Sequence, residues 1–198
     1  MKSYLTYLFI IFNLLSTVQA GEWKFSYRSS IKYFSAIWGS ASNNVFALLN
    51  DGLISHYDGS QRQEMESNTL LNLHGIWGSS GTDVFAVGEG GTIIHYDGNQ
   101  WDPMNSGTSH ILYCIWGTSS TDVFAIGWDS VGETGSIILH YDGNQWKLMS
   151  TINEVSDSFY SIWGSSSTDV FAVGDSGKII HYDGNQWNFM NIATLFHL

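Results

Sequence analysis

"SSSTDVFAVGDSGKIIHYDGNQW" (residues 165–187) is the most informative stretch of this chain, because most of it recurs several times along the sequence. The segment "HYDGNQW" begins at His95, His140 and His181, and a weaker form, "HYDGSQR", begins at His56. Aligning the copies on the tryptophan of their shared "IWG" gives intervals of 39, 39 and 47 residues, between Trp38, Trp77, Trp116 and Trp163. A segment that recurs at such a period indicates a repeat architecture.

Each copy divides into four short predicted strands. In the last copy they are "SFYSIWG" (158–164), "DVFAVG" (169–174), "KIIHY" (178–182) and "QWNFMN" (186–191). The Asp-Gly pair between the third and fourth strands predicts a type I′ hairpin turn, with positive φ at both central residues. The flanking His/Tyr and Gln/Trp are predicted to be cross-strand pairs. The "SSSTD" segment joins the first two strands, where its side chains can bond to the local backbone.

A four-stranded unit of about 39 residues that is apolar on both faces is typical of a β-propeller blade, because neighbouring blades must cover each sheet. The sequence therefore predicts an all-β, propeller-like domain over residues 21–198. Its four blades are expected at about 33–68, 72–107, 111–150 and 158–191, with an extra strand at 21–30. Two arrangements remain open, a closed four-bladed ring and an open arc. An open arc would leave edges that favour a homo-oligomer.

The stretch "DVFAVGDSGKIIHYDGNQW" (169–187) resembles the short blades of Asp-box (BNR) and photosystem II assembly-factor-like propellers. The resemblance extends from about Trp23 onward and implies a propeller fold and an interaction or assembly role. "HYDGNQW" departs from the usual Asp box because it lacks the leading Ser or Thr. The sialidases that carry Asp boxes grip their substrate with three arginines, whereas this chain has only Arg28 and Arg62. A sialidase activity is therefore not expected.

The first twenty residues predict a secretory signal peptide cleaved before Gly21. Lys2 precedes an apolar run at about 4–15, and Val18-Gln19-Ala20 ends it in the small-residue pattern of a cleavage site. The alternative, a membrane anchor, is less favoured because the run is shorter than the roughly 20 residues of a spanning helix. The expected location is secreted, or periplasmic at the cell envelope. The one cysteine, Cys114, has no partner for an intramolecular disulfide.

Composition excludes several classes of function. The chain has 198 residues, of which 43% are hydrophobic, and 18 acidic residues stand against 7 basic ones, for a net charge of -11. This charge repels phosphate backbones, so nucleic acid is not an expected partner.

His181 and Asp183 lie two apart on a strand and could suggest acid–base or metal chemistry, but each such pair sits in a different blade. We interpret the repeated histidines as structural and expect no catalytic residue, metal or cofactor.

The tryptophans form two repeated sets. Trp38, Trp77, Trp116 and Trp163 are expected to pack between blades; the alternative is a multivalent, sugar-binding lectin with one tryptophan per blade. The second set lies on the outermost strands, at Trp101, Trp146 and Trp187. Arg62 replaces this second set in the first copy, which predicts that the position tolerates exposure.

The residues that interrupt the repeat are the candidates for a ligand site. The third copy has an insertion at 127–136 and a longer connection at 150–158, and an antiparallel meander places both loops on one rim. The candidate binding residues on these loops are Trp128, Asp129, Glu133, Glu154 and Asp157. The alternative is sequence drift in a duplicated repeat. The predicted function is an exported, non-catalytic module that binds a partner protein; the alternatives are a surface-glycan lectin and, less favoured, a glycoside hydrolase.

Overall fold

The computed structural model describes residues 32–128, 135–152 and 158–190, which form four antiparallel sheets of four strands each. Blade 1 contains β1 (Phe34–Ala41), β2 (Asn44–Leu49), β3 (Ile54–Tyr57) and β4 (Arg62–Met65). Blade 2 contains β5 (Leu73–Ser80), β6 (Asp83–Gly88), β7 (Ile93–Tyr96) and β8 (Trp101–Met104). Blade 3 contains β9 (Ile111–Ser119), β10 (Asp122–Trp128), β11 (Ser136–Tyr141) and β12 (Trp146–Ile152). Blade 4 contains β13 (Phe159–Ser166), β14 (Asp169–Gly174), β15 (Ile179–Tyr182) and β16 (Trp187–Phe189).

The strands of each blade pair in chain order, so every blade is a simple meander. A single 3-10 turn follows the second strand in blades 2 and 4, as η1 (Glu89–Gly91) and η2 (Asp175–Gly177). These sheets confirm the predicted all-β fold of four four-stranded units. Within the described ranges, no helix is both long enough and apolar enough to cross a membrane. The predicted signal peptide (1–20) and extra strand (21–30) lie outside the described residues.

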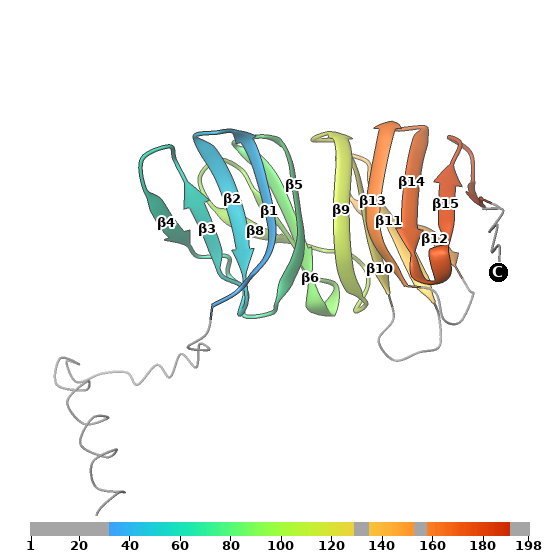
Figure 1. Cartoon of the computed structure of the whole chain (residues 1–198), viewed down its shortest axis with the longest axis horizontal. Coiled ribbons are helices and arrows are strands. Elements are labelled where there is room, and N and C mark those ends of the chain that lie inside the picture. Colours follow the sequence, from blue (N-terminus) through green and yellow to red (C-terminus); the bar gives the residue numbers. More distant parts are fainter. Residues whose placement is uncertain (1–31, 129–134, 153–157, 191–198) are drawn as a thin grey trace, which may run out of the picture.

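The four blades stand side by side in chain order, from the blue end to the orange end of Figure 1, and do not close into a ring. Their innermost strands, β1, β5, β9 and β13, are neighbours in that order. Apolar clusters fill the three spaces between consecutive blades. Of the two predicted arrangements, the described residues therefore form the open arc.

The space between blades 1 and 2 illustrates how neighbouring blades pack. Blade 1 contributes Phe46 and Leu48 from β2, and blade 2 contributes Val84 and Ala86 from β6 together with Trp101 from β8. The Trp101 ring meets the Phe46 ring edge-on, with 6.2 Å between their centroids. Apolar surface on both faces of each sheet is thus removed from water, which supplies the main driving force for folding.

The outermost tryptophans do not tolerate exposure where a preceding blade covers them. Trp101 is 1% exposed and Trp146 is 6% exposed, so the prediction drawn from Arg62 is wrong for blades 2 and 3. The physical reason is that each of these two indoles packs edge-on against a phenylalanine of the preceding blade, as Trp146 does against Phe85. In blade 1 this face has no neighbouring blade among the described residues, so Arg62 can occupy the position in contact with water.

The tryptophans of the first strands fit over glycines of the following blade. A Cβ atom built on Gly78 would lie 2.7 Å from the ring of Trp38, and one built on Gly117 would lie 2.9 Å from the ring of Trp77. Gly164 stands in the same relation to Trp116, at 2.5 Å. The predicted packing of this set between blades is confirmed for these three tryptophans. It is wrong for Trp163, which is 60% exposed because no described blade follows blade 4.

The hairpin between the third and fourth strands of each blade is wider than the predicted two-residue turn. In blade 2, Tyr96 pairs with Trp101, and the Asp97 N–H donates to the Gln100 carbonyl at 3.2 Å, which closes a four-residue loop. Gly98 has a φ of 94°, but Asp97 is not among the residues with positive φ. The type I′ assignment is therefore wrong. The Tyr–Trp pair is confirmed, whereas His95 pairs with Asp102 rather than with the glutamine.

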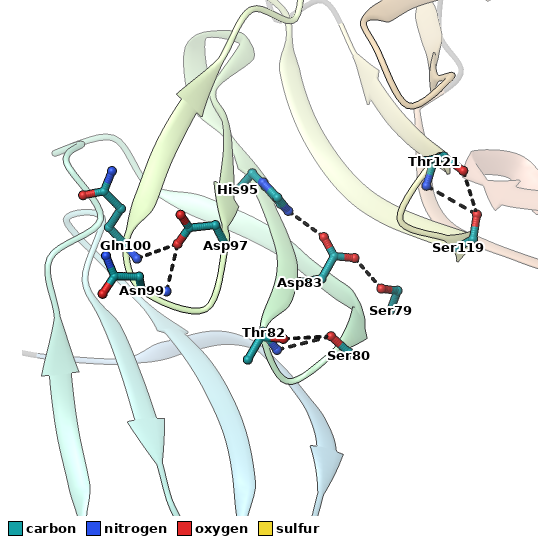
Figure 2. A network of polar contacts seen from close by, with 10 residues as sticks. All are labelled: Ser79, Ser80, Thr82, Asp83, His95, Asp97, Asn99, Gln100, Ser119 and Thr121. Atoms are coloured by element: carbon teal, nitrogen blue, oxygen red, sulfur yellow. Dashed lines mark hydrogen bonds and ion pairs between the residues drawn. The ribbon is translucent and has the colours of Figure 1, made fainter.

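The aspartate side chain explains this wider loop. Asp97 Oδ1 accepts hydrogen bonds from the backbone N–H groups of Asn99, at 2.8 Å, and Gln100, at 2.9 Å (Figure 2). A carboxylate that accepts two backbone N–H groups replaces the bonds that a tight turn would make within the backbone. The same two bonds recur at Asp58, Asp142 and Asp183.

Candidate functional site

A serine–aspartate–histidine network links the first three strands of blade 2 (Figure 2). Ser79 Oγ donates to Asp83, and the other carboxylate oxygen of Asp83 lies 2.6 Å from His95 Nε2. Blades 3 and 4 repeat the histidine bond at 2.7 Å, and blade 1 replaces the aspartate with Asn44, which lies 2.9 Å from His56. The histidine is thus bonded to the residue that opens the second strand, which agrees with the interpretation of the repeated histidines as structural.

The order of groups in this network does not fit nucleophilic catalysis. In a serine nucleophile triad, histidine lies between serine and aspartate and removes the serine proton. Here Asp83 lies in the middle, so the Ser79 hydroxyl donates to a carboxylate and does not contact His95. The imidazole also stacks on Phe85, with 4.3 Å between ring centroids. The arrangement therefore fastens the first three strands of the blade to one another.

The suggested pairing of His181 with Asp183 does not form. His181 Nε2 contacts Asp169, and Asp183 Oδ1 accepts backbone N–H groups of its own turn. Hydrogen bonds from the Ser165 hydroxyl and from His181 lower the pKa of Asp169. Among the residues that the structure describes, no group of three His, Cys, Asp or Glu side chains is placed to hold a metal ion.

Of the five predicted binding residues, the structure places Trp128. It is the last residue of β10 and is half-buried, so it belongs to a strand rather than to the loop in which it was predicted. The other four, Asp129, Glu133, Glu154 and Asp157, lie outside the described residues. Their role in binding stays a prediction.

The residues that flank these two undescribed segments lie in one row across blade 3. Trp128 pairs with Ser136, and Ser136 pairs in turn with Ile152. Trp128, Ser136 and Ile152 therefore lie at the same end of the blade 3 strands. The expectation that the irregular loops of the third copy share one rim concerns segments that lie largely outside the described residues, so it stays a prediction.

A feature that the sequence analysis missed lies on the innermost strands. His74 on β5 stacks against Tyr113 on β9, with 5.4 Å between ring centroids, and Tyr113 meets Tyr160 on β13 edge-on at 6.2 Å. These three rings, here called the inner aromatic row, connect blades 2, 3 and 4. Tyr160 is 51% exposed and the other two are half-buried, so the row presents ring surface to solvent.

Two carboxylates adjoin the inner aromatic row. Tyr160 Oη donates to Asp175 at 2.8 Å, and this bond raises the pKa of the Tyr160 phenol. His74 Nε2 lies 4.0 Å from Glu89, and burial lowers the pKa of His74, so the neutral imidazole is favoured. Glu89 and Asp175 each begin the 3-10 turn of their blade. The row therefore combines flat apolar surface with two adjoining acidic side chains.

Trp128 occupies the position in blade 3 that these carboxylates occupy in blades 2 and 4. Each of the three residues follows the glycine that ends the "VFAVG" or "VFAIG" motif. Trp128 also pairs with Ile111, two residues before Tyr113 on the neighbouring strand. The residue predicted from the irregular repeat thus lies at the same end of the blades as the inner aromatic row.

A signal for the row is present in the sequence, at a position where the repeat varies. The residues three before each repeated tryptophan are Ser35, His74, Tyr113 and Tyr160. Variation at one site within otherwise similar copies indicates that packing does not dictate the residue there. Periodicity alone could not show that the side chains of separate blades meet, because the contact depends on how the inner strands are stacked.

Comparisons with known proteins agree with this fold. A solved structure of YCF48 bound to a D1 peptide matches with a TM-score of 0.57 and 21% identity, covering 77% of this chain and 51% of that chain. A structure of YCF48 from Cyanidioschyzon merolae matches with a TM-score of 0.60 and 14% identity, covering 75% of this chain and 50% of that one. No protein-family model matches the chain, and no curated protein matches it.

These likenesses establish the fold, a row of β-propeller blades. The chain spans about half the length of both YCF48 structures. YCF48 is a photosystem II assembly factor, so the assembly-factor part of the predicted resemblance is supported at the level of fold. The Asp-box part stays a prediction.

Proposed function

We propose that this chain is a non-catalytic module that binds a segment of a partner protein at the inner aromatic row. The observation that carries the proposal is the line of three contacting rings, His74, Tyr113 and Tyr160, with Glu89 and Asp175 beside it. Solvent-facing aromatic rings next to carboxylates are well suited to bind a peptide, because they combine apolar contact with charge selection.

The charge of the site specifies the chemistry of the segment. Glu89 and Asp175 give the row a negative potential, and the whole chain carries a net charge of -11. A segment containing Lys or Arg is attracted to such a surface, and its cation can stack over a tyrosine ring. We therefore expect the partner segment to be basic, with at least one apolar side chain that covers the rest of the row.

The fold comparison supports a peptide as the ligand. One YCF48 structure of similar fold is described as bound to a D1 peptide. A propeller fold by itself determines no function, so this likeness adds to the inner aromatic row and does not replace it. Trp128 would extend the same surface, and Asp129, Glu133, Glu154 and Asp157 stay predicted contributors to binding.

The proposal can be tested by selecting displayed random 12-residue peptides on the purified chain. We expect the enriched peptides to be rich in Lys and Arg. Tyr113→Ala and Tyr160→Ala should each weaken their binding at least tenfold, which is the scale of an aromatic hot spot. The matched control is Leu148→Ser, which changes a side chain that is 59% exposed on the outer strand β12.

Two outcomes would contradict the proposed site. If Tyr113→Ala and Tyr160→Ala bind the selected peptides as the parent chain does, the row is not the binding surface. If no peptide is enriched and a glycan array yields a sugar whose binding depends on the tyrosines, the lectin hypothesis replaces the peptide hypothesis.

We also propose that the protein is exported. The support is the sequence of residues 1–20, with its single Lys2, its apolar run and the small-residue ending at Ala20. N-terminal sequencing of the protein recovered from the secreted or envelope fraction of an expressing cell should begin at Gly21. An intact N-terminus in the cytosolic fraction would contradict export.

A further inference from the structure

The two end blades of the arc each present an apolar face that no described residue covers. On blade 4, Trp163 is 60% exposed and Val173 is 43% exposed. On blade 1, Ile37 is 71% exposed and belongs to a groove of about 520 Å³ whose other lining residues include Val45 and Ala47. Exposed apolar areas of this kind, on opposite ends of one molecule, mark interaction surfaces.

The three interfaces inside the chain show which partner each end face fits. Ile37, Val45 and Ala47 of blade 1 are equivalent by repeat to Ile76, Val84 and Ala86 of blade 2, which pack against blade 1. The exposed face of blade 4 is likewise equivalent to the face by which each earlier blade contacts its successor. The uncovered face of blade 4 and the uncovered face of blade 1 are therefore the two halves of one repeated interface.

The tryptophan–glycine contacts make this complementarity specific. Gly78, Gly117 and Gly164 each lie under a tryptophan of the preceding blade. The remaining tryptophan is the exposed Trp163, and the remaining glycine is Gly39. The atoms nearest to a Cβ built on Gly39 belong to Asn44 and Val45 of its own blade, with no tryptophan ring among them.

Among the residues that distinguish the blade 1 face from its internal equivalents, two change the polarity of the contact. Ser55 stands where blade 2 has Ile94, and Arg62 stands where blade 2 has Trp101. At the internal interface, the ring of Trp101 packs on Phe46 of the preceding blade. In a contact with blade 4 of a second copy, Arg62 would place its guanidinium against the ring of Phe171, the blade 4 equivalent of Phe46. Arg62 already makes such a cation–π contact within blade 1, where its guanidinium carbon lies 5.5 Å from the ring centroid of Phe34.

We infer that blade 4 of one copy packs head to tail on blade 1 of a second copy, with Trp163 of the first over Gly39 of the second. The contact would continue the interface that already joins blades 1 to 4, with Arg62 and Ser55 in place of the internal tryptophan and isoleucine. It is heterologous, so two different faces meet, and it closes into a ring or extends as a row according to the rotation between blades. The inference does not depend on the proposed peptide-binding function.

The test is sedimentation velocity of the full chain over a concentration series. We expect reversible association, with a sedimentation coefficient that rises with concentration. Trp163→Arg and Ile37→Asp should each raise the dissociation constant at least tenfold, and Val173→Asp should repeat the effect on the blade 4 side. Leu148→Ser is the control, since it removes a comparably exposed apolar side chain that lies on neither end face.

Mixing the variants separates a head-to-tail contact from a symmetric one. The Ile37→Asp copy keeps an intact blade 4 face, and the Trp163→Arg copy keeps an intact blade 1 face. An equimolar mixture should therefore regain association that neither variant has alone. If Trp163→Arg dissociates but Ile37→Asp remains associated by itself, the contact is symmetric through blade 4 and the inference is wrong.

Two further results would also overturn the inference. A parent chain that stays monomeric at every concentration would show that no second copy covers the end faces. Equal dissociation of the Leu148→Ser control would show that the association is non-specific. Thermal melting of each variant confirms that the fold is retained before its association is compared.

Discussion

Single residues in this chain act chiefly through the turns that they support. Each Asp-Gly turn combines a carboxylate that accepts two backbone N–H groups with a glycine in the left-handed region, and Gly184 has a φ of 89°. A Cβ atom added to Gly184 would also lie 2.8 Å from Cβ of Thr168, because this turn packs against the turn between the first two strands. The glycine is thus required for two independent reasons.

Replacing Gly184 by Val should lower the free energy of unfolding by at least about 1 kcal/mol, because a β-branched residue resists positive φ. Chemical denaturation measures this loss. Gly107→Val is the matched control for the contact with Thr168, since Gly107 has a φ of 72° but no atom within 4 Å of an added Cβ. Gly184→Val should cost more than Gly107→Val. An unchanged stability for Gly184→Val would exclude the contribution assigned to this turn.

The turn aspartates predict a loss of stability in acid. Backbone N–H groups lower the pKa of Asp58, Asp97 and Asp183, and the Lys147 ammonium is the largest cause of the lowered pKa of Asp142. A carboxylate whose pKa is depressed by folding stabilises the protein above its unfolded pKa of about 3.9. That stabilisation is lost as the pH falls through the lower, folded pKa.

The measurement is the melting temperature between pH 6 and pH 2 for the parent chain and for a variant with all four turn aspartates changed to Asn. Asparagine keeps the accepting oxygen but does not titrate, so the variant should lose less stability in acid than the parent does. Parallel acid profiles for the two proteins would refute the linkage.

At the scale of the single blade, the serine–aspartate–histidine network holds the first three strands together. Asp83→Ala leaves both the Ser79 hydroxyl and the His95 imidazole without their acceptor and should cost about 1–3 kcal/mol of stability. Asp83→Asn recreates the arrangement of blade 1, in which Asn44 accepts from His56, and should cost less. Equal losses in urea denaturation would show that the carboxylate charge, rather than the hydrogen bond, supports the blade.

The irregular segment of blade 3 carries a separate prediction. Replacing residues 127–136 by the "GEGGT" of blade 2 should preserve the fold and weaken binding of the selected peptides at least tenfold. Trp128→Ala should weaken binding by about 2 kcal/mol, as expected for an aromatic hot spot. Because Trp128 is half-buried in β10, its loss should also cost stability, by about 1 kcal/mol.

The control for the graft changes Asp129 and Glu133 to Asn and Gln, which removes charge and keeps the length of the segment. Titration of each variant with one fixed peptide compares them. A graft that binds as tightly as the parent would show that the insertion is drift in a duplicated repeat, and binding would then depend on the inner aromatic row alone.

At the scale of the whole molecule, the blades are held together by the side chains that each blade packs against its neighbour. Trp101 is 1% exposed between blades 1 and 2, so Trp101→Ala should cost about 3–5 kcal/mol of stability, the usual range for a buried tryptophan. Arg62→Ala, at the equivalent but exposed position of blade 1, should change stability by no more than about 0.5 kcal/mol. Thermal unfolding in dilute solution measures both. Similar losses for the two variants would contradict the role assigned to the blade interface.

The repeated sequence is sufficient to predict four blades of four strands, as the structure has them. Strand alternation, the Asp-Gly turns and the Ser-Thr-Asp turns are local signals, since each depends on the conformational preferences of residues close together in the chain. For this reason the predicted strands "DVFAVG" and "KIIHY" correspond closely to β14 and β15. The predicted type I′ turn was wrong because the Asp183 side chain accepts hydrogen bonds from two backbone N–H groups of the turn. The prediction from the Asp-Gly pair had assumed that the turn is held by backbone hydrogen bonds alone.

Which of the repeated residues are covered depends on how the blades stack, and the repeats alone do not show this. Trp116 and Trp163 stand in nearly the same local sequence, yet the first lies against Gly164 and the second is 60% exposed. The difference depends on whether another blade follows and not on the tryptophan itself, because the residues that would cover the ring lie far along the chain. The inner aromatic row and the two end faces exist for the same reason. Stacking brings His74, Tyr113 and Tyr160 together, and at the ends of the stack no described residue takes the place of a partner for Trp163 or Gly39.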